Sequence, residues 1–437
     1  MNKISLCLVA WLSVFAPMYA QNIKFEEYNL DNGLHVILHQ DNSTPIVAVS
    51  VLYHVGSKNE DAQRTGFAHF FEHLMFEGSK NIDRGDYMKK IQGIGGELNA
   101  NTSFDRTYYY EIVPSNQLEM ALWMESERML QLKVDSIGVE TQRGVVKEER
   151  RMRYDNQPYG RVNEEVFKRT FRVHPYKWMP IGSAQYIDQA KLTEFMDFYK
   201  TFYVPNNATL TLAGDIKIDQ AKEWVKKYYG DIAKGTKEIP RPNVQEPPLG
   251  AEVVDSVFDK IKLPMISHTY RIVSQTHPDA YAVEMMMMVL GDGENSRLNK
   301  KLVDKENIAA QASAYARPME DAGIANITVL ANLGVKPSTI DSILDVEIGR
   351  MKNELISENE YTALLNKVEN YAVSSKASMA SIAENLAVNY VYYKGNTNLI
   401  NTELEFYKKV TREDIKRVAN LYLQKENRVN LHVLPKK

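Results

Sequence analysis

The chain has 437 residues, of which 44% are hydrophobic and 25% charged, and its formal net charge is −3. This length exceeds what one hydrophobic core needs, so we expect a globular protein of two similar-sized domains and exclude a mainly disordered chain. Lys plus Arg number 53 against 56 for Asp plus Glu, and no Lys/Arg block is long enough to follow a phosphate backbone. Nucleic acid is therefore not an expected partner.

Residues 1–20 have the features of a secretory signal peptide. One lysine precedes an apolar run over 4–16, and Ala20 provides a small residue for cleavage. The alternative is an uncleaved membrane anchor, although the run is shorter than the ~20 residues that a spanning helix needs. The only cysteine, Cys7, lies inside this segment. We therefore expect a mature chain without disulfides or a membrane span, exported to the periplasm of a Gram-negative bacterium.

Strands and helices are predicted to follow one another through the first half of the chain. Asn32 and Gly33 supply the positive backbone angles of a tight hairpin, which predicts a strand pair around them. Further strands are predicted over 46–55, 98–113 and 208–213. Helices are predicted over 65–77, 86–92, 115–130 and 192–203, and in a long segment that contains 141–154.

Residues 234–250 (KGTKEIPRPNVQEPPLG) contain four prolines and no hydrophobic periodicity, which indicates a linker. Beyond it the order of elements repeats, with strands over 252–258, 266–273, 309–315 and 324–331, a helix over 279–290 and then several helices. The segments 192–215 and 410–435 each predict a helix, a turn and a closing strand. A duplicated α/β unit explains this repeat. The predicted divisions are a signal peptide at 1–20, an N-terminal domain at 21–234, a linker at 235–250 and a homologous C-terminal domain at 251–437.

His69-Phe70-Phe71-Glu72-His73 combines residue types at the spacing of a zinc site. Residues three and four apart share one helix face, so both imidazoles and the Glu72 carboxylate project to the same side. Two imidazoles one turn apart can bind zinc, and the carboxylate between them can take a proton from a metal-bound water. The alternative is coincidence, with a probability on the order of one per cent in a chain with nine histidines.

The segment GFAHFFEHLMFEGS at 66–79 resembles the inverted zinc motif of the pitrilysin family, which includes insulinase and the mitochondrial processing peptidase. Similar segments occur before it at 53–60 and after it at 95–110, 142–160 and 290–298, so the resemblance covers essentially the whole mature chain. It implies an α+β fold of two tandem homologous α/β half-units, each an antiparallel sheet covered by helices. It also implies a metalloendopeptidase that carries one Zn²⁺ on His69 and His73, uses Glu72 as general base and cleaves extended peptide substrates.

In that family the third zinc ligand is a glutamate about 76 residues after the second histidine, near a Val-Val pair. Glu149 matches this position, after Val145 and Val146. Glu148 is the alternative, and adjacent helical residues diverge by about 100°, so only one of the two can face the histidines. The spacing favours Glu149 and leaves Glu148 facing solvent or supporting a ligand.

The stretch around Asn99 and Ala100 resembles the edge strand with which the family binds the backbone of its substrate. An unpaired strand edge is a template for an extended peptide. The alternative is an ordinary hairpin strand. His54 is expected to be structural. Met285 to Met288 are expected to pack in the hydrophobic core from a buried helix.

The chain departs from the family in its second half. Family members usually complete the site with an Arg and a Tyr that bind the substrate carbonyl, but Val303 and Ala310 occupy the corresponding positions. Tyr315 and Arg317 lie nearby at another spacing. We therefore expect a partner subunit, either a homologous zinc-less chain in a heterodimer or a second copy in a homodimer. The competing hypotheses are a non-catalytic scaffold or binding subunit and a different zinc hydrolase.

Overall fold

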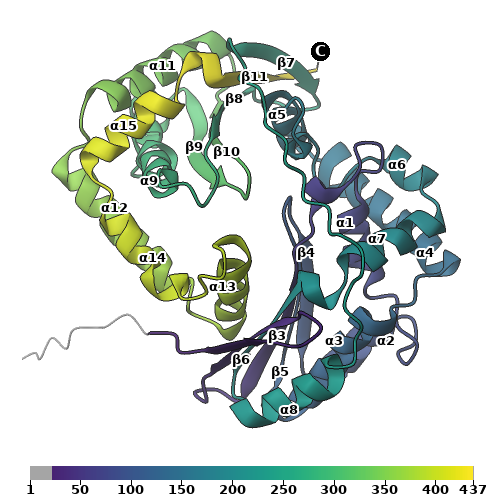
Figure 1. Cartoon of the computed structure of the whole chain (residues 1–437). Helices are drawn as coiled ribbons and strands as arrows, with labels where there is room; N and C mark the ends of the chain where they lie inside the picture. The colour runs from purple at the N-terminus through teal and green to yellow at the C-terminus, as the bar shows by residue number, and fades with distance from the viewer. Residues whose placement is uncertain (1–21, 437) are drawn as a thin grey trace, which may run out of the picture.

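The computed structural model describes residues 22–436, which form two sheets of matching strand order (Figure 1). The predicted signal peptide lies outside these residues. The first sheet has the order β1-β2-β6-β3-β5-β4 and the second the order β7-β11-β8-β10-β9. Without β1 the two orders correspond strand by strand, which confirms the predicted α+β fold of two tandem homologous half-units.

The strands of the first sheet are β1 (Glu26–Asn29), β2 (His35–Gln40), β3 (Ile46–Tyr53), β4 (Glu97–Thr102), β5 (Thr107–Pro114) and β6 (Ala208–Gly214). Those of the second are β7 (Val253–Asp259), β8 (Met265–Ile272), β9 (Ala309–Pro318), β10 (Gly323–Ala331) and β11 (Arg428–Pro435). Neighbouring strands are antiparallel except for β2 with β6 and β7 with β11. Each sheet is thus mixed rather than wholly antiparallel. The last strand of each half-unit, β6 or β11, follows several helices in the chain and pairs in parallel with β2 or β7.

The first half-unit contains α1 (Phe67–Leu74), α2 (Asp86–Gly93), α3 (Leu118–Gln131), α4 (Ser136–Arg150), α5 (Val162–Thr170), α6 (Ala184–Gln189), α7 (Leu192–Phe202) and α8 (Ile218–Tyr229). The second contains α9 (Ala280–Gly291), α10 (Arg297–Asn299), α11 (Pro337–Asn353), α12 (Glu358–Ser374), α13 (Met379–Tyr392), α14 (Leu399–Lys408) and α15 (Arg412–Tyr422). The sequence prediction missed α5, α6 and α8. It also made α1 too long, because Gly66 has φ 100°, which a helix cannot continue. None of the helices within 22–436 is both long and apolar enough to cross a membrane.

Each half-unit lends one helix to the sheet of the other half-unit. Helix α13 packs on β3 and β6, and α5 packs on β8 and β11 (Figure 1). Ile382 and Leu386 of α13 are buried in one cluster with Ile37 of the first sheet. Val166 of α5 is buried with Leu431 of the second sheet. The two half-units are therefore interlocked along their sheets as well as joined by the chain.

The proline-rich segment between α8 and β7 has no helix or strand. It is nevertheless attached to the first half-unit, since the Glu246 carboxylate accepts hydrogen bonds from the backbone N–H groups of Arg172, Val173 and His174 at 2.7–3.0 Å. The segment thus packs along the surface as an ordered connection. The exact division into domains at residues 234 and 250 stays a prediction.

The turn between β9 and β10 enters the core of the first half-unit. Met319 before the turn and Ile324 after it are 4% and 0% exposed and belong to the hydrophobic core of the first half-unit. Since both strands otherwise belong to the second sheet, this hairpin connects the two cores directly.

A buried group of charges fixes the same turn, and we call Lys58, Asp105, Glu320 and Asp321 the tip cluster. The Lys58 ammonium, only 3% exposed, lies 2.7 Å from Glu320, 3.1 Å from Asp321 and 3.1 Å from Asp105. Burial alone would lower the pKa of Lys58, but the three carboxylates raise it above its usual value. A single ammonium thus holds carboxylates from both half-units together.

Replacing Lys58 with Met is expected to lower the free energy of unfolding by about 3–5 kcal/mol, because it leaves the buried Asp105 carboxylate without a counter-ion and removes the ammonium from Glu320 and Asp321. Urea unfolding followed by circular dichroism measures this change. The matched control is Lys336→Met, at the exposed start of α11, for which a change within about 0.5 kcal/mol is expected. Equal stability of the two variants would mean that the tip cluster does not join the half-units.

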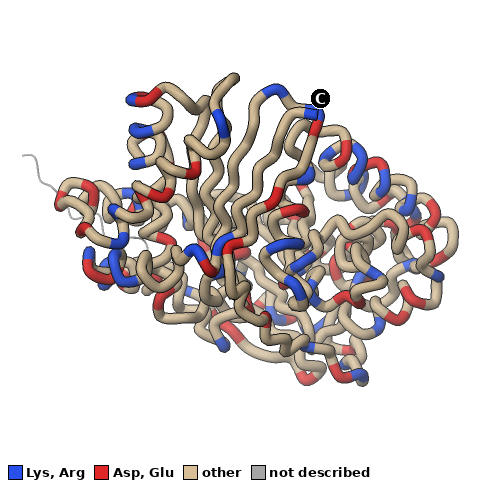
Figure 2. The backbone as a smooth tube through the Cα atoms, turned by 90° about the horizontal axis from the view of Figure 1, so that it is seen from above, with Lys and Arg blue, Asp and Glu red and all other residues tan. Residues whose placement is uncertain are grey.

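Lys and Arg are interspersed with Asp and Glu along the described backbone (Figure 2). The significance of any one cation therefore depends on its immediate neighbours rather than on a long-range field.

Candidate metal centre

Helix α1 presents two different faces. Phe67, Phe70, Phe71 and Leu74 recur at helical spacing and are buried, with Phe67 and Phe70 stacked on Phe195 of α7 at ring-centroid distances of 4.6 Å. This apolar stripe fixes the rotation of the helix. As a result, the intervening polar side chains of the motif face away from the core.

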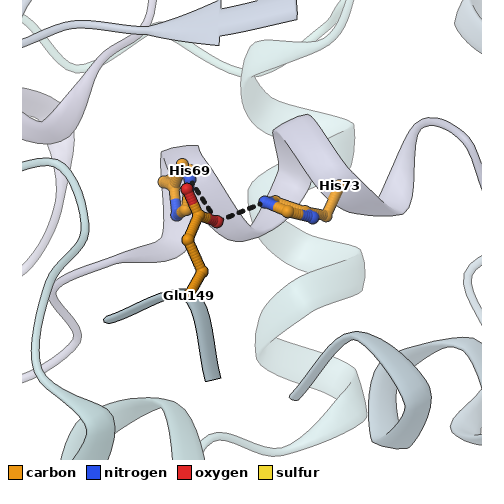
Figure 3. A group of neighbouring side chains, drawn as sticks. All are labelled: His69, His73 and Glu149. Atoms are coloured by element: carbon orange, nitrogen blue, oxygen red, sulfur yellow. Dashed lines mark hydrogen bonds and ion pairs between the residues drawn. The ribbon is translucent and has the colours of Figure 1, made fainter. Parts of the chain in front are cut away.

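On the polar side of α1, His69 and His73 converge with Glu149 of α4 (Figure 3). The Glu149 Oε2 atom lies 3.1 Å from His73 Nε2 and 3.4 Å from His69 Nε2. One ligand atom from each residue lies within 4.8 Å of the others, and no other such group of three or more occurs within 22–436. Tetrahedral coordination at about 2.0–2.1 Å needs ligand atoms roughly 3.3–3.4 Å apart, so this donor set fits a zinc ion.

The protonation states of these groups also suit a metal. Burial, and then the neighbouring His73, lower the pKa of His69 to about 4, so this imidazole is neutral at pH 7. The hydrogen bond from His73 holds the pKa of Glu149 below its usual value, so the carboxylate is ionised. Neutral imidazole and ionised carboxylate are the forms that bind zinc.

Glu72 lies on the same side of α1 and lines a cavity together with His69 and His73. Its Oε2 atom accepts a hydrogen bond from the Thr102 hydroxyl at 2.6 Å. Burial raises the pKa of Glu72 above its usual value, which moves this carboxylate toward the range of a proton acceptor near neutral pH.

The two adjacent glutamates of α4 have different surroundings. Glu148 is exposed and pairs with Arg151 at 2.6 Å, whereas Glu149 faces the histidines. The second oxygen of Glu149 forms an ion pair with the Arg153 guanidinium at 2.8 Å. Sequence reasoning overlooked Arg153, although its position four residues after Glu149 predicts the same helix face.

Asn99 and Ala100 lie on β4, the edge strand of the first sheet. Both line the cavity of about 580 Å³ that contains the three candidate ligands and Glu72. In the described chain β4 pairs with β5 on one side, so its other edge is open toward this cavity. Neither Val303 nor Ala310 is among the residues that line it.

The second half-unit has a different helix at the place that corresponds to α1. Helix α9 lies between β8 and β9 as α1 lies between β3 and β4. Met285, Met286 and Met287 of α9 are fully buried, which confirms that they are core residues, whereas Met288 is only partly buried and packs against the same core. His54 is likewise occupied elsewhere, since its Nε2 atom lies 2.8 Å from Glu320.

Comparisons with known proteins agree with this arrangement. Residues 35–180 match the family model of insulinase (peptidase family M16), and residues 189–368 match the model called peptidase M16 inactive domain. The zinc protease PqqE of Helicobacter pylori is 30% identical over 439 residues, which covers 99% of this chain and 98% of that protein. The chain therefore belongs to the M16 or pitrilysin/insulinase family, which confirms the resemblance.

Solved structures show the same fold. The crystal structure of a protease from Helicobacter pylori has a TM-score of 0.90 and 28% identity, with 94% of this chain and 100% of that chain covered. The periplasmic protease PqqL from Escherichia coli has a TM-score of 0.78 and 19% identity, with 95% of this chain but 48% of that chain covered. This chain thus matches about half of the Escherichia coli protein.

Proposed function

We propose that this chain is a zinc-dependent metalloendopeptidase that hydrolyses extended oligopeptides, with zinc on His69, His73 and Glu149. The observation that supports this most directly is the convergence of these three donor atoms within 4.8 Å beside Glu72, in a cavity bordered by an open strand edge. The names of its relatives as zinc proteases agree with this function.

Zinc at this site would supply a Lewis acid that polarises a peptide carbonyl and lowers the pKa of water. Glu72 is the proton acceptor in this proposal, and burial favours uptake of a proton by its carboxylate. The Thr102 hydroxyl donates to one oxygen of Glu72 and so orients the carboxylate. The second oxygen remains for the attacking water.

The substrate backbone would pair with β4. Alternate residues of β4 direct main-chain N–H and C=O groups to the open edge, and such pairing accepts many side-chain sequences. The Ala100 N–H donates to the Asn99 Oδ1 atom at 2.9 Å, a bond that a peptide would replace. An extended peptide in this position lies beside Glu72, since Thr102 of the same strand contacts that carboxylate.

A non-catalytic scaffold is the second hypothesis. Loss of a zinc ligand or of the base would favour it, but all four residues are present. The family model for an inactive domain matches residues 189–368, a range that contains neither the candidate ligands nor Glu72. We therefore favour an enzyme.

We further propose that the mature chain is exported to the periplasm and acts with a homologous zinc-less subunit. The signal-like segment at residues 1–20 supports export. The apolar pair Val303 and Ala310 cannot donate hydrogen bonds to a developing oxyanion, so a second subunit would supply them. The match to about half of a longer fold relative is consistent with two such units working together.

The test is to assay cleavage of a quenched fluorescent oligopeptide by the isolated mature chain and after mixing with a candidate homologue that lacks the zinc motif. We expect the mixture to exceed the isolated chain by roughly 100-fold or more, the size of a lost oxyanion donor. A chelator should abolish both activities. Full activity of the isolated chain, unchanged by the homologue, would contradict the heterodimer and favour a homodimer.

A further inference from the structure

Arg317 is a second-half-unit residue at the cavity of the first half-unit. It lies near the end of β9 and lines the cavity together with Glu72 and His73. Its guanidinium carbon lies 5.3 Å from the centre of the Phe104 ring, within the range of a cation–π contact. Arg317 is exposed, and in the described part of the chain no carboxylate pairs with it.

The backbone that carries Arg317 is held firmly against the first half-unit. Arg317 pairs in register with Ile324, which is fully buried in the first core. Two members of the tip cluster, Glu320 and Asp321, lie three and four residues after Arg317. The Glu320 N–H donates to Asp105 at 3.2 Å, and the Asp321 N–H donates to the Tyr176 hydroxyl at 3.1 Å. The fold thus presents this guanidinium to the cavity at a defined position.

The other charged groups of the cavity already have partners. Arg153 is paired with Glu149, and Glu72 accepts from Thr102. Arg317 is the remaining cation that lines the cavity. A guanidinium has five donors in a planar fork that matches a carboxylate, and stacking on an aromatic ring leaves these edge donors available.

We propose that Arg317 binds a carboxylate of the peptide substrate and gives this peptidase a preference for acidic peptides. This inference rests on the proposed function and names its substrate class. Phe104 lies two residues beyond the end of β4, so the carboxylate belongs to the part of the peptide at that end of the strand. A peptide antiparallel to β4 has its N-terminal part there, which selects an Asp or Glu side chain. A parallel peptide has its C-terminal part there, which also admits the terminal carboxylate.

The experiment uses peptides of one length: a neutral parent, variants with a single Asp at each position on either side of the cleaved bond, and forms with a free or an amidated C-terminus. Binding is measured by fluorescence anisotropy with the zinc-loaded Glu72→Gln variant. The kcat/KM for hydrolysis is measured with the chain that keeps Glu72. We expect one acidic position or the free terminus to improve binding roughly tenfold over the neutral form, the effect of one charge-assisted hydrogen bond. The position that gains identifies the source of the carboxylate.

Arg317→Gln should abolish the ratio of the affinity for the favoured acidic peptide to the affinity for the neutral peptide. Arg317→Lys should keep part of this ratio because the charge remains. Lys336→Gln removes one exposed charge from the same half-unit outside the cavity and should leave the ratio intact. A ratio that survives in Arg317→Gln, or equal binding of all the peptides, would overturn the proposal. Hydrolysis separates this outcome from failure of the proposed function, because a chain that binds acidic peptides through Arg317 but cleaves none would contradict only the latter.

Discussion

Replacing Glu72 with Gln is expected to reduce kcat for peptide hydrolysis by about 100-fold to 10,000-fold, the usual contribution of a general base. The amide keeps the shape of the side chain but cannot accept a proton. The zinc content should stay near one per chain, because Glu72 is not among the three converging donors. Turnover of a quenched fluorescent peptide and elemental analysis of the same preparation measure the two quantities.

A companion variant tests the environment of this carboxylate. The hydrogen bond from Thr102 lowers the pKa of Glu72 against the larger effect of burial. Thr102→Val should therefore raise that pKa, and because the base acts when deprotonated, the acidic limb of the pH–rate profile should move to higher pH. Near-normal turnover of Glu72→Gln would exclude Glu72 as the base.

Loss of zinc is the second large effect that we expect. His69→Ala, His73→Ala and Glu149→Gln each remove one of three protein ligands, so the affinity for zinc should fall by more than ~100-fold, the upper limit for changes in outer-shell partners. Elemental analysis after dialysis against a weak chelator measures this loss.

Glu148→Gln is the matched control, because it makes the same chemical change one residue away on an exposed side chain. It should retain close to one zinc per chain. If Glu148→Gln emptied the site while Glu149→Gln kept the metal, the third ligand would have to be reassigned.

The sequence by itself determined the features that depend on local geometry. Helical spacing placed His69, Glu72 and His73 on one side of a helix, and the apolar residues between them fixed its buried face. The duplicated helix, turn and strand predicted two half-units of one topology, which the matching strand orders confirm. Family spacing favoured Glu149 over Glu148, and the structure brings Glu149 to the histidines while leaving Glu148 in solvent.

Only the tertiary structure decided how the two half-units meet. Hydrophobic periodicity indicates that one face of α5 or α13 is buried, but it cannot indicate which sheet covers that face, so the exchange of helices was not predictable. Arg317 was noticed only as lying at the wrong spacing for a family residue. It reaches the cavity because buried charges and apolar contacts between distant segments fix the turn after β9, and no periodicity in the sequence encodes such contacts.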